Sequence, residues 1–358
     1  MLRHRARGAL FLAGMLLVPA VPLAAQGNQD LGNHAAVLKR EHPEVYDLMI
    51  RIERAHGIVF GALAPEGEAV RARGDSLPTY GFELDMVERL TALVNEKGQA
   101  DDVAEEAAAG YAVLGPRAAQ IIARGNAFYR EILGILADRT VTNRNAELAA
   151  AVERYRSRPE LALPAKPKNM DVLYDHSYAL DFRGGYADLD GFLWAGHWLD
   201  LAVSEPLTDF AEPDRRLAGL DTVRARYFAK LTYGEPPEFF PSEVPLAPAI
   251  APGLIFLSPQ AAMIWDNLNM MQEVLADVLA SPQLDDLHAA IDETVDWFMD
   301  PENGTTDQDF WEIMALRHGI FFQGGYPIAV MTESERNLGG HAAHLQEGAV
   351  PIMSGMPG

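Results

Sequence analysis

The sequence contains no cysteine among its 358 residues. Disulfide bonds, thiolate metal sites, lipid attachment to a cysteine and covalent attachment of a c-type haem are therefore excluded. Basic residues are also scarce, because 29 Lys and Arg stand against 51 Asp and Glu and give a formal net charge of −22. Such a charge repels nucleic acid and anionic lipid headgroups. We therefore expect no nucleic-acid partner and a preference for basic partners or cationic ligands.

Long apolar runs are missing except near the start of the chain. Three arginines within the first seven residues precede an apolar stretch, residues 9–18, that is too short for an ordinary membrane-spanning helix. Small residues follow, and we predict a secretory signal peptide over residues 1–25 with cleavage after Ala25. The mature chain would be periplasmic or extracellular and would have no transmembrane span. An uncleaved N-terminal membrane anchor is the alternative.

Signatures of common enzyme classes are also missing. The sequence has no G-x-S-x-G elbow, no H-E-x-x-H pair, no Walker loop and no glycine fingerprint for dinucleotides. One Glu-x-x-His pair is present, Glu53 with His56, whereas a di-iron bundle needs two such pairs and two further carboxylates. Whether the protein is an enzyme stays open on this evidence.

Apolar residues recur every three or four positions over most of the chain, which predicts an all-α, multi-helix bundle. In the helix predicted to start at Pro43, for example, Val45, Leu48 and Ile52 fall on one face. Further helices are predicted near residues 82–95, 101–114, 116–135, 144–156, 188–205, 220–231, 259–280, 282–299 and 308–322. A stretch rich in Tyr, Val and Leu with a Gly-Gly turn, residues 171–186, is predicted to form a small β-hairpin.

A run containing prolines and lysines divides the chain into two predicted domains. We expect an N-terminal helical bundle over residues 26–158, a linker over 159–170 and a C-terminal helical domain over 171–335, followed by a flexible tail over 336–358. All five tryptophans fall in or beside the helices predicted for the C-terminal domain. We therefore expect an aromatic-rich core there.

The densest cluster of histidines and carboxylates lies in and just before one predicted helix of the C-terminal domain. Asp190 and His197 fall on one face of this helix, and the preceding stretch supplies His176 and Asp181. Imidazole and carboxylate groups can bind a divalent metal ion, so these four residues form a candidate metal site. The alternative is structural. Asp188 would cap the helix, Asp190 would complement its dipole, and His197 would be a hydrogen-bonded core residue.

A second set of carboxylates lies on the helix predicted after Ser258. Asp266, Glu273 and Asp277 fall along one stripe, and apolar residues form the opposite stripe. The carboxylate stripe is interpreted either as one wall of a carboxylate site or as a helix face exposed to solvent.

Residues 244–265 contain no charged side chain and include four prolines. The prolines exclude a continuous helix in the first part, which is predicted to be extended up to Ser258, with Pro259 at the start of a helix. An apolar strap of this kind either crosses the helical core or binds a partner. The residues proposed to bind a partner are Phe239, Phe240, Leu246, Ile250, Leu254, Ile255 and Phe256.

These features favour an exported, acidic, helical protein that acts as a non-catalytic scaffold or docking subunit for a protein partner in the cell envelope or at a membrane. The alternative is a metal-dependent enzyme with a His and carboxylate site in the C-terminal half. No cofactor other than a divalent metal ion is suggested.

Overall fold

The computed structural model describes residues 30–305 except for 76, 99, 101–103, 209–212 and 233–243. Within these residues the regular structure is helical and contains no β-strand, which confirms the predicted all-α fold. The predicted signal peptide, the tail and the helix predicted near 308–322 lie outside the described residues, as do Phe239 and Phe240. No described helix combines the length and the apolar character needed to cross a membrane.

In chain order, one group of helices precedes α10 and a second group runs from α10 onward. The helices of the first group are α2 (Ala35–Glu41), α3 (Pro43–Arg73), α4 (Phe82–Val94), α5 (Ala104–Tyr111), α6 (Gly115–Ala137), α7 (Arg144–Arg156), α8 (Val172–Asp175) and α9 (Asp181–Gly185), with the 3-10 turn η1 (Ala112–Leu114) between α5 and α6. The second group contains α10 (Ala187–Thr208), α11 (Pro213–Thr232), α12 (Ala247–Ile250), α13 (Pro252–Leu257), α14 (Pro259–Ala280) and α15 (Leu287–Met299), followed by the 3-10 turn η2 (Pro301–Asn303).

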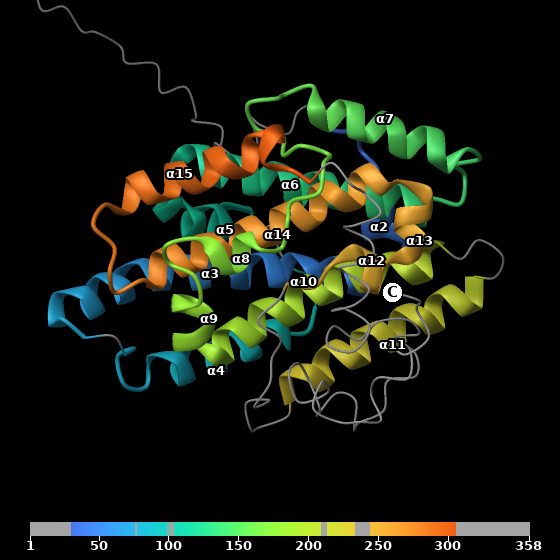
Figure 1. Ribbon diagram of the computed structural model, residues 1–358. Coiled ribbons are helices and arrows are strands. Elements are labelled where there is room, and N and C mark those ends of the chain that lie inside the picture. Colours follow the sequence, from blue (N-terminus) through green and yellow to red (C-terminus); the bar gives the residue numbers. More distant parts are fainter. Residues whose placement is uncertain are drawn as a thin grey trace, which may run out of the picture.

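Four long helices form the centre of the molecule. Helices α3 and α6 each pack against both α10 and α14, so that the four helices close a ring (Figure 1). The other helices cover this bundle: α5 packs on α3, α2 and α7 pack on α6, α11 packs on α10, and α15 packs on α14. The apolar side chains buried between these helices form one continuous cluster that runs from Leu38 to Phe298. The division into two domains stays a prediction.

Helix α14 is the most completely buried of the long helices, because every residue from Ala261 to Ala280 is buried. Ser258 caps its N-terminus by accepting a hydrogen bond from the Ala261 N–H at 3.4 Å, and Pro259 occupies the first turn, as predicted. The carboxylate stripe of α14 therefore lies inside the protein, and its interpretation as a solvent-exposed face is wrong. Other helices surround α14, so only interior groups are within reach of its polar side chains, and an unpaired polar atom there is costly.

Helices α3 and α5 approach each other closely at two glycines. A Cβ atom at Gly110 would overlap the Gly57 carbonyl oxygen, and a Cβ atom at Gly57 would lie 2.7 Å from the Ala107 oxygen. Any side chain at either position would force the helix backbones apart, so glycine is required for this packing.

Residues 171–186 do not form the predicted β-hairpin, because the segment contains the short helices α8 and α9. Asp277 of α14 accepts hydrogen bonds from the backbone N–H groups of Phe182 (2.9 Å) and Arg183 (3.4 Å) at the start of α9. The Arg183 side chain in turn donates to the Leu173 oxygen in α8. A buried carboxylate from a distant helix thus satisfies backbone groups that a hairpin would have paired with each other.

The uncharged segment is not extended as predicted, because α12 and α13 occupy most of it. A proline lies in the first turn of each short helix, where it needs no hydrogen-bonded N–H. Leu246, Ile250 and Leu254 are completely buried in the core of this chain, and Ile255 is half-buried. Phe256 is 86% exposed and is the one described residue of the predicted partner-binding set that faces solvent.

The predicted linker is fixed to the core by one side chain of α14. The Asn267 amide donates to the Pro164 and Lys166 oxygens, both at 2.9 Å, and its oxygen accepts from the Lys168 N–H at 3.2 Å. Lys168 itself is buried, and its ammonium donates to the carbonyl oxygens of Trp297 and Asp300 at the end of α15. This segment therefore crosses a buried part of the protein.

Candidate functional site

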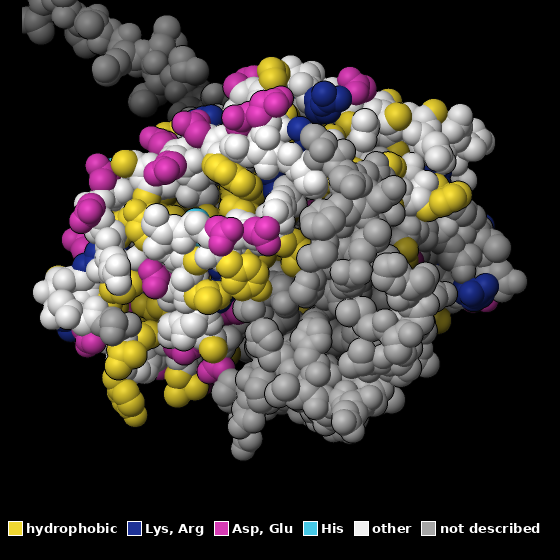
Figure 2. Space-filling view, in the orientation of Figure 1, with side chains coloured by type: hydrophobic (Ala, Val, Ile, Leu, Met, Phe, Trp, Pro, Cys, Tyr) yellow, Lys and Arg dark blue, Asp and Glu magenta, His cyan; other side chains and the backbone are white. Residues whose placement is uncertain are grey.

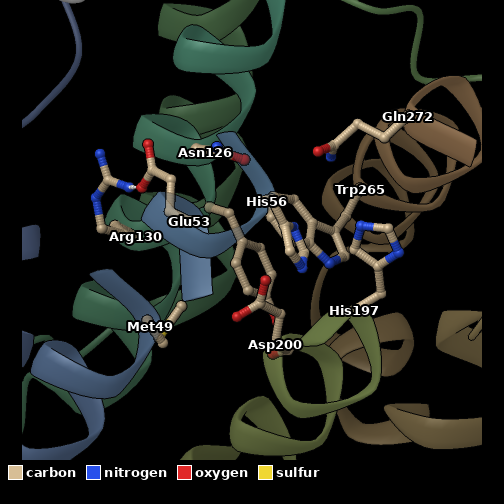
Figure 3. A pocket seen from close by; sticks show the side chains of 10 residues that line it. Met49, Glu53, His56, Asn126, Arg130, His197, Asp200, Trp265 and Gln272 are labelled. Carbon is tan, nitrogen blue, oxygen red and sulfur yellow. Dashed lines mark hydrogen bonds and ion pairs between the residues drawn. The ribbon is translucent and has the colours of Figure 1, made fainter. Parts of the chain in front are cut away.

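A polar cavity lies at the centre of the bundle formed by α3, α6, α10 and α14 (Figure 3). Its volume is about 20 Å³, which is enough for a single water molecule. Each of the four helices contributes side chains to it. The lining residues are Met49, Glu53 and His56 from α3, Asn126, Tyr129 and Arg130 from α6, His197 and Asp200 from α10, and Trp265 and Gln272 from α14.

Two histidines meet edge to face in this cavity. The ring centroids of His56 and His197 lie 4.9 Å apart at an interplanar angle of 79°, beside Trp265 (Figure 3). Both residues are buried, and His56 Nε2 and both ring nitrogens of His197 form no hydrogen bond within the described part of the chain. Burial lowers the pKa of His197 to about 3 and lowers the pKa of His56 well below its usual value. Both imidazoles are therefore neutral at physiological pH.

Two carboxyl groups lie behind the histidines. Glu273 Oε1 of α14 is 3.4 Å from His197 Nδ1, and Asp190 of α10 lies close to the Glu273 side chain. Burial raises the pKa of Glu273 to about 8. Burial, and then the neighbouring charge of Glu273, raise the pKa of Asp190 well above its usual value. Two neighbouring buried carboxyls hold a proton at neutral pH, because two negative charges side by side in the interior are costly.

The opposite side of the cavity carries the one charged pair among its lining residues. Arg130 donates to the Glu53 carboxylate, and the two side chains are drawn joined in Figure 3. Asp200 lies nearby, and burial together with the Glu53 charge raises its pKa well above its usual value. Tyr129 stacks on Trp265 with ring centroids 3.7 Å apart and donates its hydroxyl to the Asp200 carbonyl oxygen. Both rings of this stacked pair line the cavity.

The four residues predicted to bind a metal do not gather at one point. His176 and Asp181 lie near Asp277, whereas Asp190 and His197 lie near Glu273. Glu273 and Asp277 are one turn apart on α14, so the two halves of the predicted set are neighbours but separate. Within the described part of the chain, no group of three or more His, Asp or Glu side chains is arranged to hold a metal ion.

Asp277 has more hydrogen-bond and ion-pair partners than Glu273. Its carboxylate lies 2.8 Å from Arg183 Nη2 and 3.3 Å from His176 Nε2, and it accepts the two backbone hydrogen bonds described above. Burial raises the pKa of the nearby Asp181 carboxyl, and the Asp277 charge acts in the same direction. This cluster fixes α9 and the loop before it to α14, and it provides each charge with an opposite charge.

The free backbone N–H groups at the start of α10 are hydrogen-bonded by a side chain from another helix, α4. Asp188 lies in the first turn of α10 and is not its N-cap, contrary to the structural interpretation of the sequence. The Glu83 carboxylate of α4 accepts hydrogen bonds from the Asp188 and Leu189 N–H groups at 2.6 and 3.1 Å. Asp190 also lies in the first turn of α10 but is close to Glu273, so its role is not limited to the helix dipole.

At neutral pH the cavity of water size is thus lined by two neutral imidazoles and by the charged Arg130–Glu53 pair, with the Glu273 and Asp190 carboxyls behind the imidazoles. Such groups can exchange protons with a bound water molecule, but an organic substrate does not fit between them. His56, Glu53 and Glu273 were visible in the sequence as a single Glu-x-x-His pair and as part of the acidic stripe of α14. Their convergence with His197 depends on how the helices pack, which the sequence pattern does not show.

Comparison with known proteins finds no matching family model, no matching curated protein and no matching solved structure.

Proposed function

We propose that this protein is exported and acts as a non-catalytic docking protein for a basic partner in the cell envelope. The observation that carries this proposal is the size of the polar centre. Its volume of about 20 Å³ lies far below the roughly 300 Å³ at which pockets for small organic molecules begin. The buried histidines and carboxyls of the bundle therefore have no access to an organic substrate. The arginine-rich, apolar N-terminus supports export.

The contact surface that we propose lies where α3 leads into α4. Leu77 is 66% exposed, Leu84 is 68% exposed, and Tyr80 is fully exposed. Hydrophobic side chains protrude at this end of the molecule in Figure 2. Large apolar side chains clustered on a surface favour partner binding, and the net charge of −22 favours a partner with a basic face. Phe256 of the uncharged segment offers a second exposed aromatic contact.

Capture experiments with the exported protein test this proposal. Cross-linking in intact envelopes, followed by mass spectrometry, compares the wild type with Leu77→Ser/Tyr80→Ser and with Phe256→Ser. A matched control is Leu217→Ser, which removes a half-exposed apolar side chain of α11. We expect the double variant to lose a partner that the control retains. Retention of every partner by the double variant and by Phe256→Ser contradicts the docking proposal, provided that circular dichroism shows folded proteins.

A metal-dependent enzyme is the second candidate function. It is favoured by His56 Nε2 and both nitrogens of His197, which are buried without hydrogen bonds in the described structure. These two imidazoles would supply two protein ligands, and the described residues place no third His, Asp or Glu side chain with them in a metal-binding arrangement. Neutral imidazoles with free nitrogens are ligands for divalent transition metals. Metal content of the purified protein distinguishes this candidate when the wild type is compared with His197→Ala and with His288→Ala, which alters an exposed histidine of α15. Substoichiometric metal in the wild type contradicts it.

A further inference from the structure

A second cavity, separate from the polar centre, opens between α8, α14 and α15. Its volume is about 470 Å³, within the range of roughly 300–1,000 Å³ typical of small-molecule sites. Figure 1 shows α8 lying over α14 with α15 alongside. The lining residues are Asn169, Asp171, Val172, Asp175, His176, Ser177, Tyr178, Val274, Ala290, Glu293, Thr294, Trp297 and Phe298. None of them lines the polar centre.

The charges around this cavity are mostly negative. Asp171, Asp175 and Glu293 line it, and none of these three carboxylates forms an ion pair with a described lysine or arginine. Asp171 accepts a hydrogen bond from the neutral Asn169 amide at 2.7 Å. No lysine or arginine is among the lining residues. The cavity therefore attracts a positively charged guest and repels an anion.

Nearby basic groups are already bound to the protein. Arg183 is paired with Asp277 behind the cavity, at 2.8 Å. The Lys168 ammonium lies 5.0 Å from the centroid of the Trp297 ring and donates to two carbonyl oxygens, and burial lowers its pKa to about 8. The three lining carboxylates thus outnumber these two cations, of which Arg183 is already paired with Asp277. On the face shown in Figure 2, Asp and Glu side chains lie next to exposed hydrophobic ones in the region of α8 and α15.

Aromatic side chains supply the second half of a cation site. Tyr178, Trp297 and Phe298 line the cavity, with Val274 and Ala290 at its buried floor. Aromatic faces attract organic cations, and tryptophan does so most strongly. Carboxylates at the rim and aromatic rings inside are the combination that recognises an ammonium group with alkyl substituents. A bare metal ion would not use the apolar floor.

We propose that this cavity binds a small organic cation, either a protonated amine or a quaternary ammonium compound, with Trp297 as the main contact and Glu293 as the main counter-charge. This site is independent of the docking surface proposed above. His176, predicted from the sequence as a metal ligand, is here a wall residue whose Nε2 faces Asp277 at 3.3 Å.

Isothermal titration calorimetry of the whole protein in 150 mM salt tests the proposal with methylammonium, choline and benzyltrimethylammonium as probes. Salt at this concentration screens loose attraction to the acidic surface. We expect saturable one-to-one binding of at least one probe. For choline, the neutral isostere 3,3-dimethylbutan-1-ol should bind at least about tenfold more weakly. Absence of saturable binding for all three cations overturns the proposal, as does equal binding of the neutral isostere.

Two variants and a matched control locate the site. Trp297→Leu should weaken binding by about 5–30-fold, because it removes the aromatic face. Glu293→Gln should weaken it by about 3–10-fold, because it removes an exposed counter-charge without disturbing the core. Asp292→Asn is the control: it removes the same charge from the neighbouring, exposed position of α15, which does not line the cavity, and should change affinity by less than about twofold. Equal effects of Glu293→Gln and Asp292→Asn overturn the assignment to this cavity.

Discussion

Glu273 and Asp277 are two buried acids one turn apart on the same helix, yet their surroundings differ sharply. Asp277 is bound by the Arg183 guanidinium and by two backbone N–H groups. Glu273 accepts no hydrogen bond from an N–H group of the described residues, and its neighbours are the Asp190 carboxyl and the His197 imidazole. Asp277 is therefore provided with the partners that an anion requires, whereas Glu273 is kept as a neutral acid.

The same contrast holds for two amides of α14. Asn267 and Asn269 are both completely buried. Asn267 makes three hydrogen bonds to the segment that crosses beneath it, whereas neither polar atom of Asn269 has a partner within the described structure. One set of polar residues on α14 thus holds distant segments in place. Other polar residues of α14, Asn269 and Glu273, are buried and have side-chain atoms without a hydrogen-bond partner in the described structure.

Removing the partner of Asp277 should have the largest effect on stability. In Arg183→Met the Asp277 carboxylate stays buried without its cation, and we expect the free energy of unfolding to fall by about 3–5 kcal/mol. Urea denaturation followed by circular dichroism measures this change. Arg156→Met is the control, because Arg156 pairs with Glu153 on the surface of α7 and should contribute less than about 1 kcal/mol. Similar losses in both variants would contradict a special contribution of the buried Arg183–Asp277 pair to stability.

Replacing Asn267 and Asn269 by leucine should change the free energy of unfolding by different amounts, with an intermediate loss for Asn267 and little or none for Asn269. Asn267→Leu leaves the oxygens of Pro164 and Lys166 and the N–H of Lys168 without partners and should destabilise the protein by about 2–4 kcal/mol. Asn269→Leu removes a polar group that has no partner within the described structure, so its stability should stay within about 1 kcal/mol of the wild type or increase. Chemical denaturation of both variants measures the difference. A large loss for Asn269→Leu would reveal a bound water or ion that satisfies this amide.

Features that depend on neighbouring residues could be predicted from the sequence. The helical periodicity and the Ser258–Pro259 start of α14 are local, and both predictions are confirmed. The helix predicted near residues 282–299 begins later, at Leu287, because Asp286 caps it by accepting from the Ala289 N–H. Ser281 accepts from the Gln283 N–H within a turn. Competing local caps are hard to rank without the packing that selects one of them.

Features that depend on distant contacts could not be predicted in the same way. The acidic stripe of α14 has the periodicity of a surface helix, yet surrounding helices cover it. The predicted metal ligands include His197 and Asp190, which do lie in the polar centre or beside it, but His56 and Glu273 complete that centre from other helices. A sequence pattern reports spacing along one helix and leaves the relative rotation of four helices undetermined.

The smallest effect should appear in the pH dependence of stability, and it isolates Glu273. A glutamate in the unfolded chain ionises near its ordinary pKa of 4.5, whereas the folded protein holds this proton up to a pKa of about 8. The folded state therefore binds more protons than the unfolded state between these values, and stability falls as pH rises. His197 acts in the opposite direction below its ordinary pKa of 6.5, because only the unfolded imidazole is protonated there. Between pH 6.5 and 8 the buried acids make stability fall as pH rises, whereas Lys168, whose pKa burial lowers to about 8, acts in the opposite direction near pH 8 in the wild type and in the variant alike.

Glu273→Gln removes one of these acids and should make that slope shallower. Between pH 6.5 and 8 the wild type should lose on the order of 1–2 kcal/mol more stability than the variant. Urea denaturation at several pH values measures both slopes, and Glu153→Gln on the exposed face of α7 should follow the wild type. Asp190 keeps its own raised pKa in the variant, so some slope should remain. Parallel curves for the wild type and Glu273→Gln would show that Glu273 is ionised in the folded protein. The contrast with Asp277 would then require a positive charge at the bundle centre, which is the arrangement that a metal-dependent enzyme would need.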